Sequence, residues 1–223
     1  MTDSAASARS ARRARLDAQT IVDAGLELAG TGVPAISVRE LGVHLGADPT
    51  AIYRHFRSKD ALMSALLDEI DLRAAAEVTA PREQWQARLR ELAASTLKWY
   101  IAYPAIGAEA TVLTTHGDGE LTAVEFMLDA FTVAGLRDGD LVRHYALMAS
   151  HILSGASGIA RARSTADADA TSSPWFEGPL LADPRKYPLV AQNVVALAEL
   201  EDRDLFMAGV ETIIQSAERV GAH

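Results

Sequence analysis

The chain has 223 residues, 49% of them hydrophobic, and a formal net charge of -9. This length is sufficient to bury a large core in one domain or two. The absence of cysteine excludes disulfides and thiolate chemistry. No apolar run approaches the roughly 20 residues that a membrane-spanning helix needs, and the N-terminus lacks the apolar core of a signal peptide. We therefore expect a cytoplasmic protein with no membrane partner.

The acidic charge is unevenly distributed along the chain. Residues 1–60 contain eight Lys or Arg against seven Asp or Glu, a net charge of +1, so the rest of the chain carries -10. Because phosphates repel an acidic surface, only the N-terminal part is suited to approach a nucleic acid. Residues 1–14 are mainly Ala, Ser and Arg without an apolar period, which predicts a disordered basic arm. Its arginines either contact phosphates or only keep the chain in solution.

Two helices are predicted directly after the arm. An apolar helical period starts at Leu16 and ends at the Gly30-Thr31-Gly32 turn. Ser37 is placed to cap a second, short helix that ends at Gly46. Glu40, three residues after Ser37, gives this second helix the pattern of a capping box.

A third helix, over about 49–56, is predicted to be the element that enters DNA. The Asp48 side chain can accept hydrogen bonds from first-turn amides, and Pro49 has a fixed φ and no amide to lose. Ile52 and Phe56 lie four residues apart and can face a core, which leaves the other face for a partner. A helix, a Gly-containing turn and a second helix led by small, polar residues form the pattern of a helix-turn-helix.

Several motifs in this region closely resemble the DNA-binding domain of the tetracycline-repressor (TetR) family. They are Ser37-Val38-Arg39-Glu40-Leu41, Leu45-Gly46, Ile52-Tyr53-Arg54-His55-Phe56 and Ser58-Lys59-Asp60-Ala61-Leu62. The resemblance spans residues 16–67 and implies an all-α homodimer. In such a protein a three-helix helix-turn-helix domain, here about 15–60, precedes a helical ligand-binding and dimerisation domain, here about 61–223. Gly42 departs from the alanine usual in the family's second helix, at a cost of about 1 kcal/mol in helix propensity.

The resemblance also indicates residues that contact phosphates. Lys59 is predicted at the start of the next helix, where free amides and a cation together bind phosphate, and the family uses the matching lysine in this way. Tyr53 and His55 resemble the family's phosphate-contacting and groove-edge residues. The alternatives are that Tyr53 belongs partly to the core and that His55 only caps or packs.

Other residues are placed to meet base edges. Thr50 and Ala51 are small enough to let the helix approach closely and touch a thymine methyl group. Arg39 and Arg54 can each reach a guanine edge or a phosphate, and the sequence does not choose between these. The full set of predicted DNA contacts is Ser37, Arg39, Asp48, Thr50, Ala51, Tyr53, Arg54, His55 and Lys59.

The rest of the chain is predicted to be helical. A helix from Ser58 toward Val78 would link the DNA-binding domain to the body, and further helices are expected at about 82–103, 105–115, 120–134, 138–162, 188–200 and 203–219. Residues 163–187 have the composition of a loop. By resemblance, the helices at 138–162 and 203–219 pair with their mates in a dimer, where the small residues Gly155, Gly158 and Gly209 suit close packing.

The effector is the least defined partner. Apolar and aromatic residues with a few polar tips are candidates to line its pocket, although ordinary core positions are the alternative for each: Trp99, Tyr103, Phe126, Met127, His144, Met148, His151 and Trp175. Trp175, in the predicted loop, would either cover the pocket or anchor the loop. We expect no metal and no cofactor, since no second ligand stands at a tight spacing beside His144 or His151.

Three functions are compared. An enzyme would need a nucleophile with its base, a phosphate-binding glycine loop or paired carboxylates, and no compelling set of these is present, so we expect no enzyme. The sequence favours a ligand-responsive repressor that binds a palindromic operator as a homodimer and is released by a small apolar or aromatic effector. Repression is favoured only by what is usual in the family that the sequence resembles, in which a dimer on promoter DNA blocks polymerase without further contacts. The alternative is a helical adaptor or activator with no small-molecule effector.

Overall fold

The computed structural model describes residues 16–163, 174–175, 178 and 180–222. Within these residues the protein has ten helices and no strand, apart from one isolated bridge between Pro174 and Glu201. The all-α class predicted from the sequence is therefore confirmed. The predicted basic arm at 1–14 lies outside the described residues, as do residues 164–173, 176, 177 and 179 of the predicted loop.

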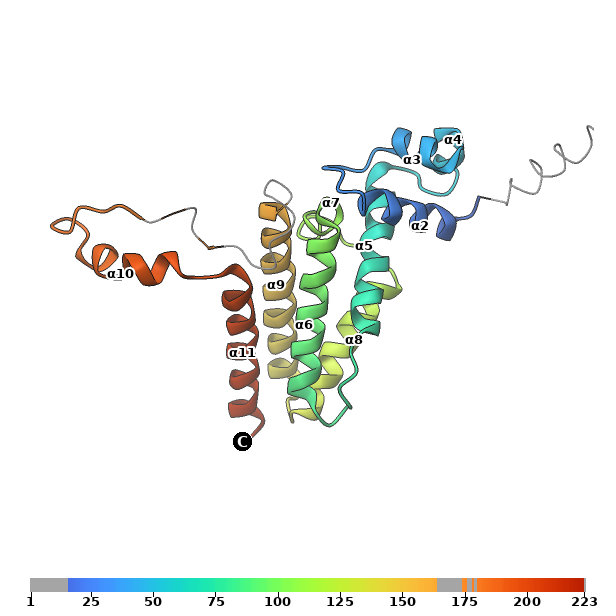
Figure 1. Ribbon diagram of the computed structural model, residues 1–223. Helices are drawn as coiled ribbons and strands as arrows, with labels where there is room; N and C mark the ends of the chain where they lie inside the picture. Colours follow the sequence, from blue (N-terminus) through green and yellow to red (C-terminus); the bar gives the residue numbers. More distant parts are fainter. Residues whose placement is uncertain (1–15, 164–173, 176–177, 179, 223) are drawn as a thin grey trace, which may run out of the picture.

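The N-terminal domain is formed by α2 (Ala18–Ala29), α3 (Val38–Leu45) and α4 (Pro49–Tyr53), grouped at one end of the molecule (Figure 1). The Ser37 hydroxyl accepts a hydrogen bond from the Glu40 amide (3.4 Å), so the predicted cap of α3 is confirmed. Gly46 ends α3 in the left-handed region (φ 63°), which favours glycine. The turn after α3 is tight, because a Cβ on Gly42 would lie 2.9 Å from the carbonyl oxygen of Ala47.

The helix predicted over about 49–56 is shorter in the structure. It ends at Tyr53, and the amides of His55 and Phe56 both donate to the Ile52 carbonyl, which closes one further turn. The chain then leaves the helical path, because Ser58 adopts an extended conformation (φ -151°, ψ 169°) in order to cap the next helix.

That next helix, α5 (Lys59–Ala76), belongs to both parts of the molecule. It packs against α2 at its beginning and against α6 (Trp85–Ala102) and α8 (Asp118–Val133) further along, as Figure 1 shows. Close approach to α2 depends on Gly25, where a Cβ would lie 2.7 Å from a methyl group of Leu66. Helix α5 therefore connects the N-terminal domain to the body through direct contacts with both.

The body also contains α7 (Pro104–Gly107), α9 (Asp138–Arg163) and α11 (Asp202–Gly221). The helix predicted at 105–115 is wrong, since α7 has only four residues. Two pairs containing β-branched residues, Thr111-Val112 and Thr114-Thr115, disfavour helix there. The amides of Thr115 and His116 donate instead to the Glu120 carboxylate, at 2.9 and 2.8 Å.

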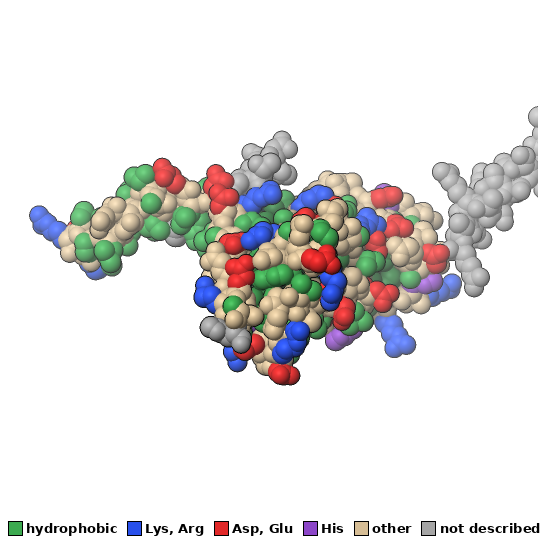
Figure 2. Space-filling view, turned by 90° about the horizontal axis from the view of Figure 1, so that it is seen from below, with side chains coloured by type: hydrophobic (Ala, Val, Ile, Leu, Met, Phe, Trp, Pro, Cys, Tyr) green, Lys and Arg blue, Asp and Glu red, His purple; other side chains and the backbone are tan. Residues whose placement is uncertain are grey.

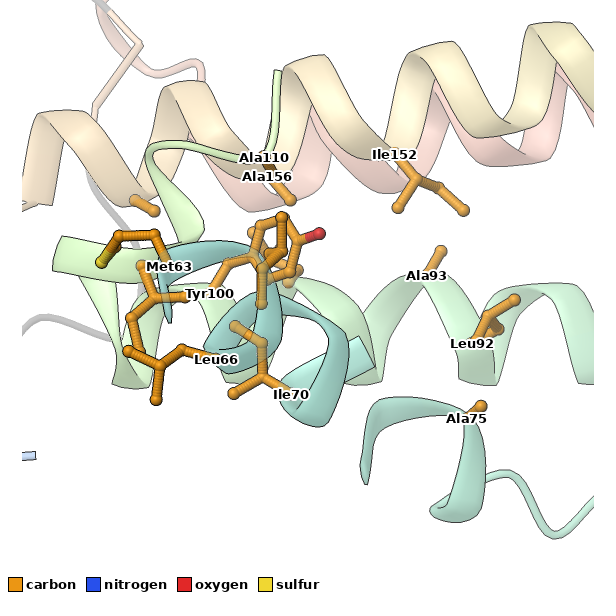
Figure 3. Packing of buried hydrophobic residues seen from close by; sticks show 14 of the residues in the cluster. Met63, Leu66, Ile70, Ala75, Leu92, Ala93, Tyr100, Ala110, Ile152 and Ala156 are labelled. Carbon is orange, nitrogen blue, oxygen red and sulfur yellow. The ribbon is translucent and has the colours of Figure 1, made fainter. Parts of the chain in front are cut away.

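The core of the body lies between α5, α6 and α9. Figure 3 shows Tyr100 of α6 in the middle of this packing, close to Leu66 and Ile70 of α5. The Tyr100 ring is fully buried, and a Cβ on Gly107 would lie 2.6 Å from the Cβ of Tyr100, so α7 presses directly on it. This packing fixes the position of the tyrosine side chain.

Helices α9 and α11 run antiparallel, side by side, along one flank of the body (Figure 1). A buried ion pair joins the end of α9 to the start of α11: Arg163 Nη2 lies 2.9 Å from Asp202 Oδ1, and both side chains are 7% exposed. Two glycines permit close packing here. A Cβ on Gly155 would lie 2.8 Å from the Phe206 ring, and one on Gly209 would overlap the ring of His151.

Helix α10 (Pro188–Ala198) projects away from the body and has no buried residue. Its hydrophobic side chains lie along the projecting arm in Figure 2, and Leu189 and Val195 are 72% and 66% exposed. No helix in the described ranges is both long enough and apolar enough to cross a membrane.

Candidate DNA-binding surface and effector cavity

The start of α4 is held by a compact hydrogen-bonded turn. Asp48 Oδ1 accepts from the Thr50 hydroxyl (2.6 Å) and from the Thr50 amide (2.8 Å). The bond from the Thr50 hydroxyl, and then the bond from its amide, lower the pKa of Asp48 below its usual value. Asp48 therefore acts as the cap of α4 and also engages the Thr50 hydroxyl.

Helix α4 has the two faces predicted from the sequence. Ile52 and Phe56 are buried beneath it. Tyr53 is 47% exposed, and Arg54 and His55 are exposed at the end of the helix. Ala51, near the start of the helix, is partly buried. The exposed face is thus free to meet another molecule.

Among the described residues, the basic side chains of Arg39, Arg54 and Lys59 form no ion pair. Within the described part of the chain, no carboxylate lies within 4.0 Å of the charged groups of Arg39, Arg54 or Lys59. Lys59 is the first residue of α5, whose cap is the Ser58 hydroxyl, an acceptor from the Ala61 amide at 3.0 Å. Exposed cations that lack an internal partner are suited to bind phosphates.

A cavity of about 450 Å³, here called the central cavity, lies in the body between α5, α6, α8 and α9. This volume is typical of small-molecule sites. The lining combines apolar side chains with hydroxyl groups, among them Leu67, Leu92, Val124, Met127, Ile152, Thr96, Thr111 and Tyr145. An apolar ligand with a few polar groups would suit these walls.

Two carboxylates, Asp71 of α5 and Glu120 of α8, also line the central cavity. Asp71 Oδ1 accepts a hydrogen bond from the Tyr100 hydroxyl at 2.9 Å. Burial raises the pKa of Asp71 to about 7; the Tyr100 bond opposes this shift, and the neighbouring charges of Asp68 and Glu120 add to it. Burial, followed by the Asp71 charge, raises the pKa of Tyr100 well above its usual value.

Asp68, one turn before Asp71, connects α5 to the beginning of α8. Its carboxylate accepts from the amides of Gly119 and Glu120, both at 3.0 Å, and from the Thr115 hydroxyl at 2.7 Å. A side chain of α5 thus caps the N-terminus of α8, where a negative charge is favourable. The two helices also touch closely, since a Cβ on Gly119 would overlap the Asp68 carbonyl oxygen.

The residues predicted to line an effector pocket are dispersed. Met127 lines the central cavity. Trp99 stacks on Tyr103 (ring centroids 5.7 Å apart), and Phe126 lies under the Arg88 guanidinium at 4.1 Å from its ring centroid. Met148 is fully buried core.

The two predicted histidines of α9 have structural partners. His144 is buried, bonded through its ring nitrogens to the Asp140 carbonyl (2.8 Å) and to Ser216 Oγ (3.2 Å). His151 Nε2 bonds to the Phe206 carbonyl at 2.8 Å. Among the described residues, no group of three His, Asp or Glu side chains is placed to bind a metal ion, at these histidines or elsewhere.

A second hollow, of about 770 Å³, lies on the outer flank of α9 and α11. His151 and the exposed Trp175 both border it. Of the three glycines expected at a dimer contact, Gly155 and Gly209 serve packing between α9 and α11 of the same chain, whereas Gly158 has no atom within 4 Å of an added Cβ. Only Gly158 is therefore left as a small, open position on this flank.

Comparison with known families agrees with this architecture. Residues 21–66 match the model of bacterial regulatory proteins of the tetR family, and residues 79–220 match the tetracyclin repressor-like C-terminal domain. The chain belongs to the TetR family. The N-terminal match covers most of α2, then α3, α4 and the first half of α5, and the C-terminal match begins just before α6.

Individual TetR-family proteins align along most of the chain. The tetracycline repressor protein class D of Escherichia coli is 30% identical over 210 residues, which cover 92% of this chain and 90% of the relative. The solved structure of SCO7222, a TetR from Streptomyces coelicolor, is 24% identical with a TM-score of 0.70 and covers 92% of this chain and 99% of its own. The structure of the Streptomyces coelicolor protein ActR in complex with actinorhodin has a TM-score of 0.74 at 18% identity, over 94% and 100% of the two chains.

Sequence reasoning missed the polar residues of the central cavity. Asp68 and Asp71 stand three apart beside Leu67, Ile70 and Ala74, which are buried residues of α5. Two acids at helical spacing on an apolar face are a signal that could have indicated a polar site, because carboxylates are rarely buried without a partner. The partner of Asp71, Tyr100, is 29 residues away in the chain and could not be paired with it from spacing alone.

Proposed function

We propose that this TetR-family regulator is a repressor that binds a palindromic operator as a homodimer and is released when a small effector enters the central cavity. Its relatives are transcriptional regulators. The proposal rests on one observation above others: α5 carries Lys59 beside α4 at one end and Asp71 in the lining of the central cavity further along. Operator binding also places its action in the cytoplasm.

The length of α5 makes it an effective connection. Its 18 residues extend for about 27 Å at the α-helical rise of 1.5 Å per residue. Tilting such a helix by about 5° moves one end by roughly 2 Å relative to the other. In a dimer the two α4 helices must stand about 34 to 36 Å apart to enter successive major grooves, so opposite movements of both subunits would add.

Dimerisation is proposed through the exposed flank of α9 and α11. Apolar side chains on this flank are accessible in the single chain, including Val142, Leu147 and Leu153 of α9 and Leu205 of α11. Exposed apolar side chains at helical spacing are suited to a helix bundle between two copies. Gly158 would permit close approach there.

The DNA contacts are proposed at the nine residues predicted from the sequence. An operator is first isolated by selecting DNA from a random pool with the wild-type protein. Lys59→Ala and Tyr53→Ala are then compared with Lys186→Ala, which removes a cation next to α10, far from α4. We expect gel shifts to weaken at least tenfold for the first two variants and to stay within twofold for the third, with all three dimeric by light scattering. Equal affinities would refute the assignment.

Release of DNA by an effector would distinguish the proposed repressor from the alternatives, which are a helical adaptor or an activator that has no small-molecule effector. Thermal-shift screening of small apolar and aromatic compounds should find ligands that raise the melting temperature, since a ligand that binds only the folded state stabilises it. The same ligands should release the selected operator and restore transcription in vitro. If no stabilising ligand releases DNA, the switch is refuted, and transcription stimulated by the bound dimer would identify an activator.

A further inference from the structure

We propose that the effector of the central cavity is a lipophilic organic cation, and that Asp71 is its charge partner. This inference names the effector class for the function proposed above. Cation binding at Asp71 can be tested independently of that function, whereas the release of DNA by the cation rests on it. Asp71 and Glu120 both line the cavity, and no Lys, Arg or His is found among its described lining residues. The cavity therefore has acidic walls without an internal counter-charge.

The two carboxylates differ in how far the protein itself satisfies them. Glu120 Oε2 accepts from the amides of Thr115 and His116, so it is engaged in holding the loop before α8. Asp71 accepts a single hydrogen bond, from Tyr100 to Oδ1, and within the described part of the chain Oδ2 has no donor. Asp71 is only partly buried, so Oδ2 remains accessible from the cavity, and a bound cation would supply the partner that the described residues do not.

The position of Asp71 is well defined before any ligand binds. Its partner Tyr100 is fully buried and packed against α7 at Gly107, and its hydroxyl donates to Oδ1 at 2.9 Å. The accessible part of Asp71 faces the cavity. Such a preorganised acceptor gains affinity because little ordering is needed on binding.

The remaining walls indicate the chemical class of the cation. Apolar side chains such as Leu67, Leu92 and Met127 dominate the lining and would strip water from a small inorganic ion without replacing it. No group of three described acidic or His side chains is placed to bind a metal. An organic ammonium or phosphonium ion with an apolar body satisfies both the walls and the carboxylate.

Binding at Asp71 would act directly on the connecting helix. Asp71 lies one turn beyond Asp68, whose carboxylate caps α8. A cation held between Asp71 and the cavity walls formed by α8 and α9 would pull α5 toward those helices, close to the Asp68 cap. The same helix begins at Lys59, on the DNA-binding surface.

The affinity for a permanent cation should depend on pH. The groups that face Asp71 from the surrounding helices are Asp68 of α5, Tyr100 of α6, Glu120 of α8 and Tyr145 of α9, and none of these carries a positive charge. Because burial raises the pKa of Asp71 to about 7, the carboxyl group must lose a proton to pair with the cation. Affinity should then rise by about tenfold from pH 6 to pH 8.

The test uses two probes of the same shape and opposite charge, tetraphenylphosphonium and tetraphenylborate, titrated calorimetrically into the full-length protein in sodium buffer without DNA. Benzyltrimethylammonium serves as a smaller cation. We expect tetraphenylphosphonium or the smaller cation to bind at least tenfold more tightly than the anion. Asp71→Asn should weaken the cation at least tenfold and abolish its pH dependence.

A matched control separates a specific site from the overall acidity of the protein. Glu125→Gln removes the same charge from an exposed position of α8 outside the central cavity, and it should change affinity less than twofold. Equal losses in Asp71→Asn and Glu125→Gln would overturn the proposal. Tighter binding of the anion, or no binding of either cation at millimolar concentration, would also overturn it.

A second variant covers the case in which Asp71→Asn does not fold. Tyr100→Phe keeps the charge of Asp71 but removes the bond that lowers its pKa, so cation binding should persist with its pH midpoint shifted upward. An unshifted midpoint would overturn the proposal. A gel shift with the selected operator then tests the release of DNA separately. If a cation binds at Asp71 but does not release DNA, the proposed switch is refuted and the cation site is not. If neutral ligands release DNA equally from the wild type and from Asp71→Asn, the assignment of a cationic effector is refuted and the switch is not.

Discussion

The partly buried carboxyl group of Asp71 predicts how the stability of the protein depends on pH. Asp71→Asn replaces it with a neutral side chain of the same shape, whose oxygen can still accept from Tyr100. The pKa of Asp71 is about 7 in the folded protein and about 3.8 when unfolded. Between these values the folded state binds more protons than the unfolded state, so the free energy of unfolding falls as pH rises.

The size of the effect follows from the same two pKa values. One pH unit of proton linkage corresponds to about 1.4 kcal/mol, and the window from pH 5 to pH 8 contains about two such units. The upper limit is therefore about 3 kcal/mol. Because Asp71 faces a cavity that solvent can enter, we expect about 1 to 2 kcal/mol, or a few degrees in melting temperature for a chain of this length.

Urea unfolding at pH 5 and pH 8, at one fixed protein concentration, measures this difference. Asp71→Asn should match the wild type at pH 5 within about 1 kcal/mol and become relatively more stable at pH 8 by about 1 to 2 kcal/mol. Titration of the histidines cancels in the comparison, and Glu125→Gln should show no such change. A difference between wild type and Asp71→Asn that is independent of pH, or that reverses in sign, would refute the reasoning.

Two further predictions concern the contact between α9 and α11. Asp202→Ala removes the carboxylate that Arg163 Nη2 binds in the buried ion pair, and it should lower the free energy of unfolding by about 3 to 5 kcal/mol in urea melts. Asp204→Ala, on the exposed side of the same turn, should cost less than about 0.5 kcal/mol, and similar losses for the two variants would contradict the burial of the pair. Gly209→Ala places a methyl group against the His151 ring and should lower the free energy of unfolding by about 1 to 3 kcal/mol in the same urea melts. Gly139→Ala, in open surroundings, should be neutral or slightly stabilising. If Gly209→Ala leaves the free energy of unfolding unchanged, the His151 ring moves aside freely.

The sequence by itself determined the DNA-binding domain closely. Ser37, Gly46, Asp48 and Ser58 set the ends of α3, α4 and α5 through hydrogen bonds to amides no more than three residues away, or through their own backbone conformation. Such interactions are local, so they can be identified without knowledge of the tertiary structure. The family resemblance rests on the same short segment.

Only the tertiary structure determines which residues line the central cavity. Asp71 meets Tyr100 across 29 residues, and Asp68 caps a helix that begins 50 residues later. Aromatic and histidine side chains were favoured as pocket residues by their type, yet residues such as Met148 and His144 are equally suited to a core, and it is the crossing of α5, α6, α8 and α9 that assigns them to it. Spacing along the chain fixes which residues share a helix face, whereas the packing of helices against one another fixes which faces enclose a cavity.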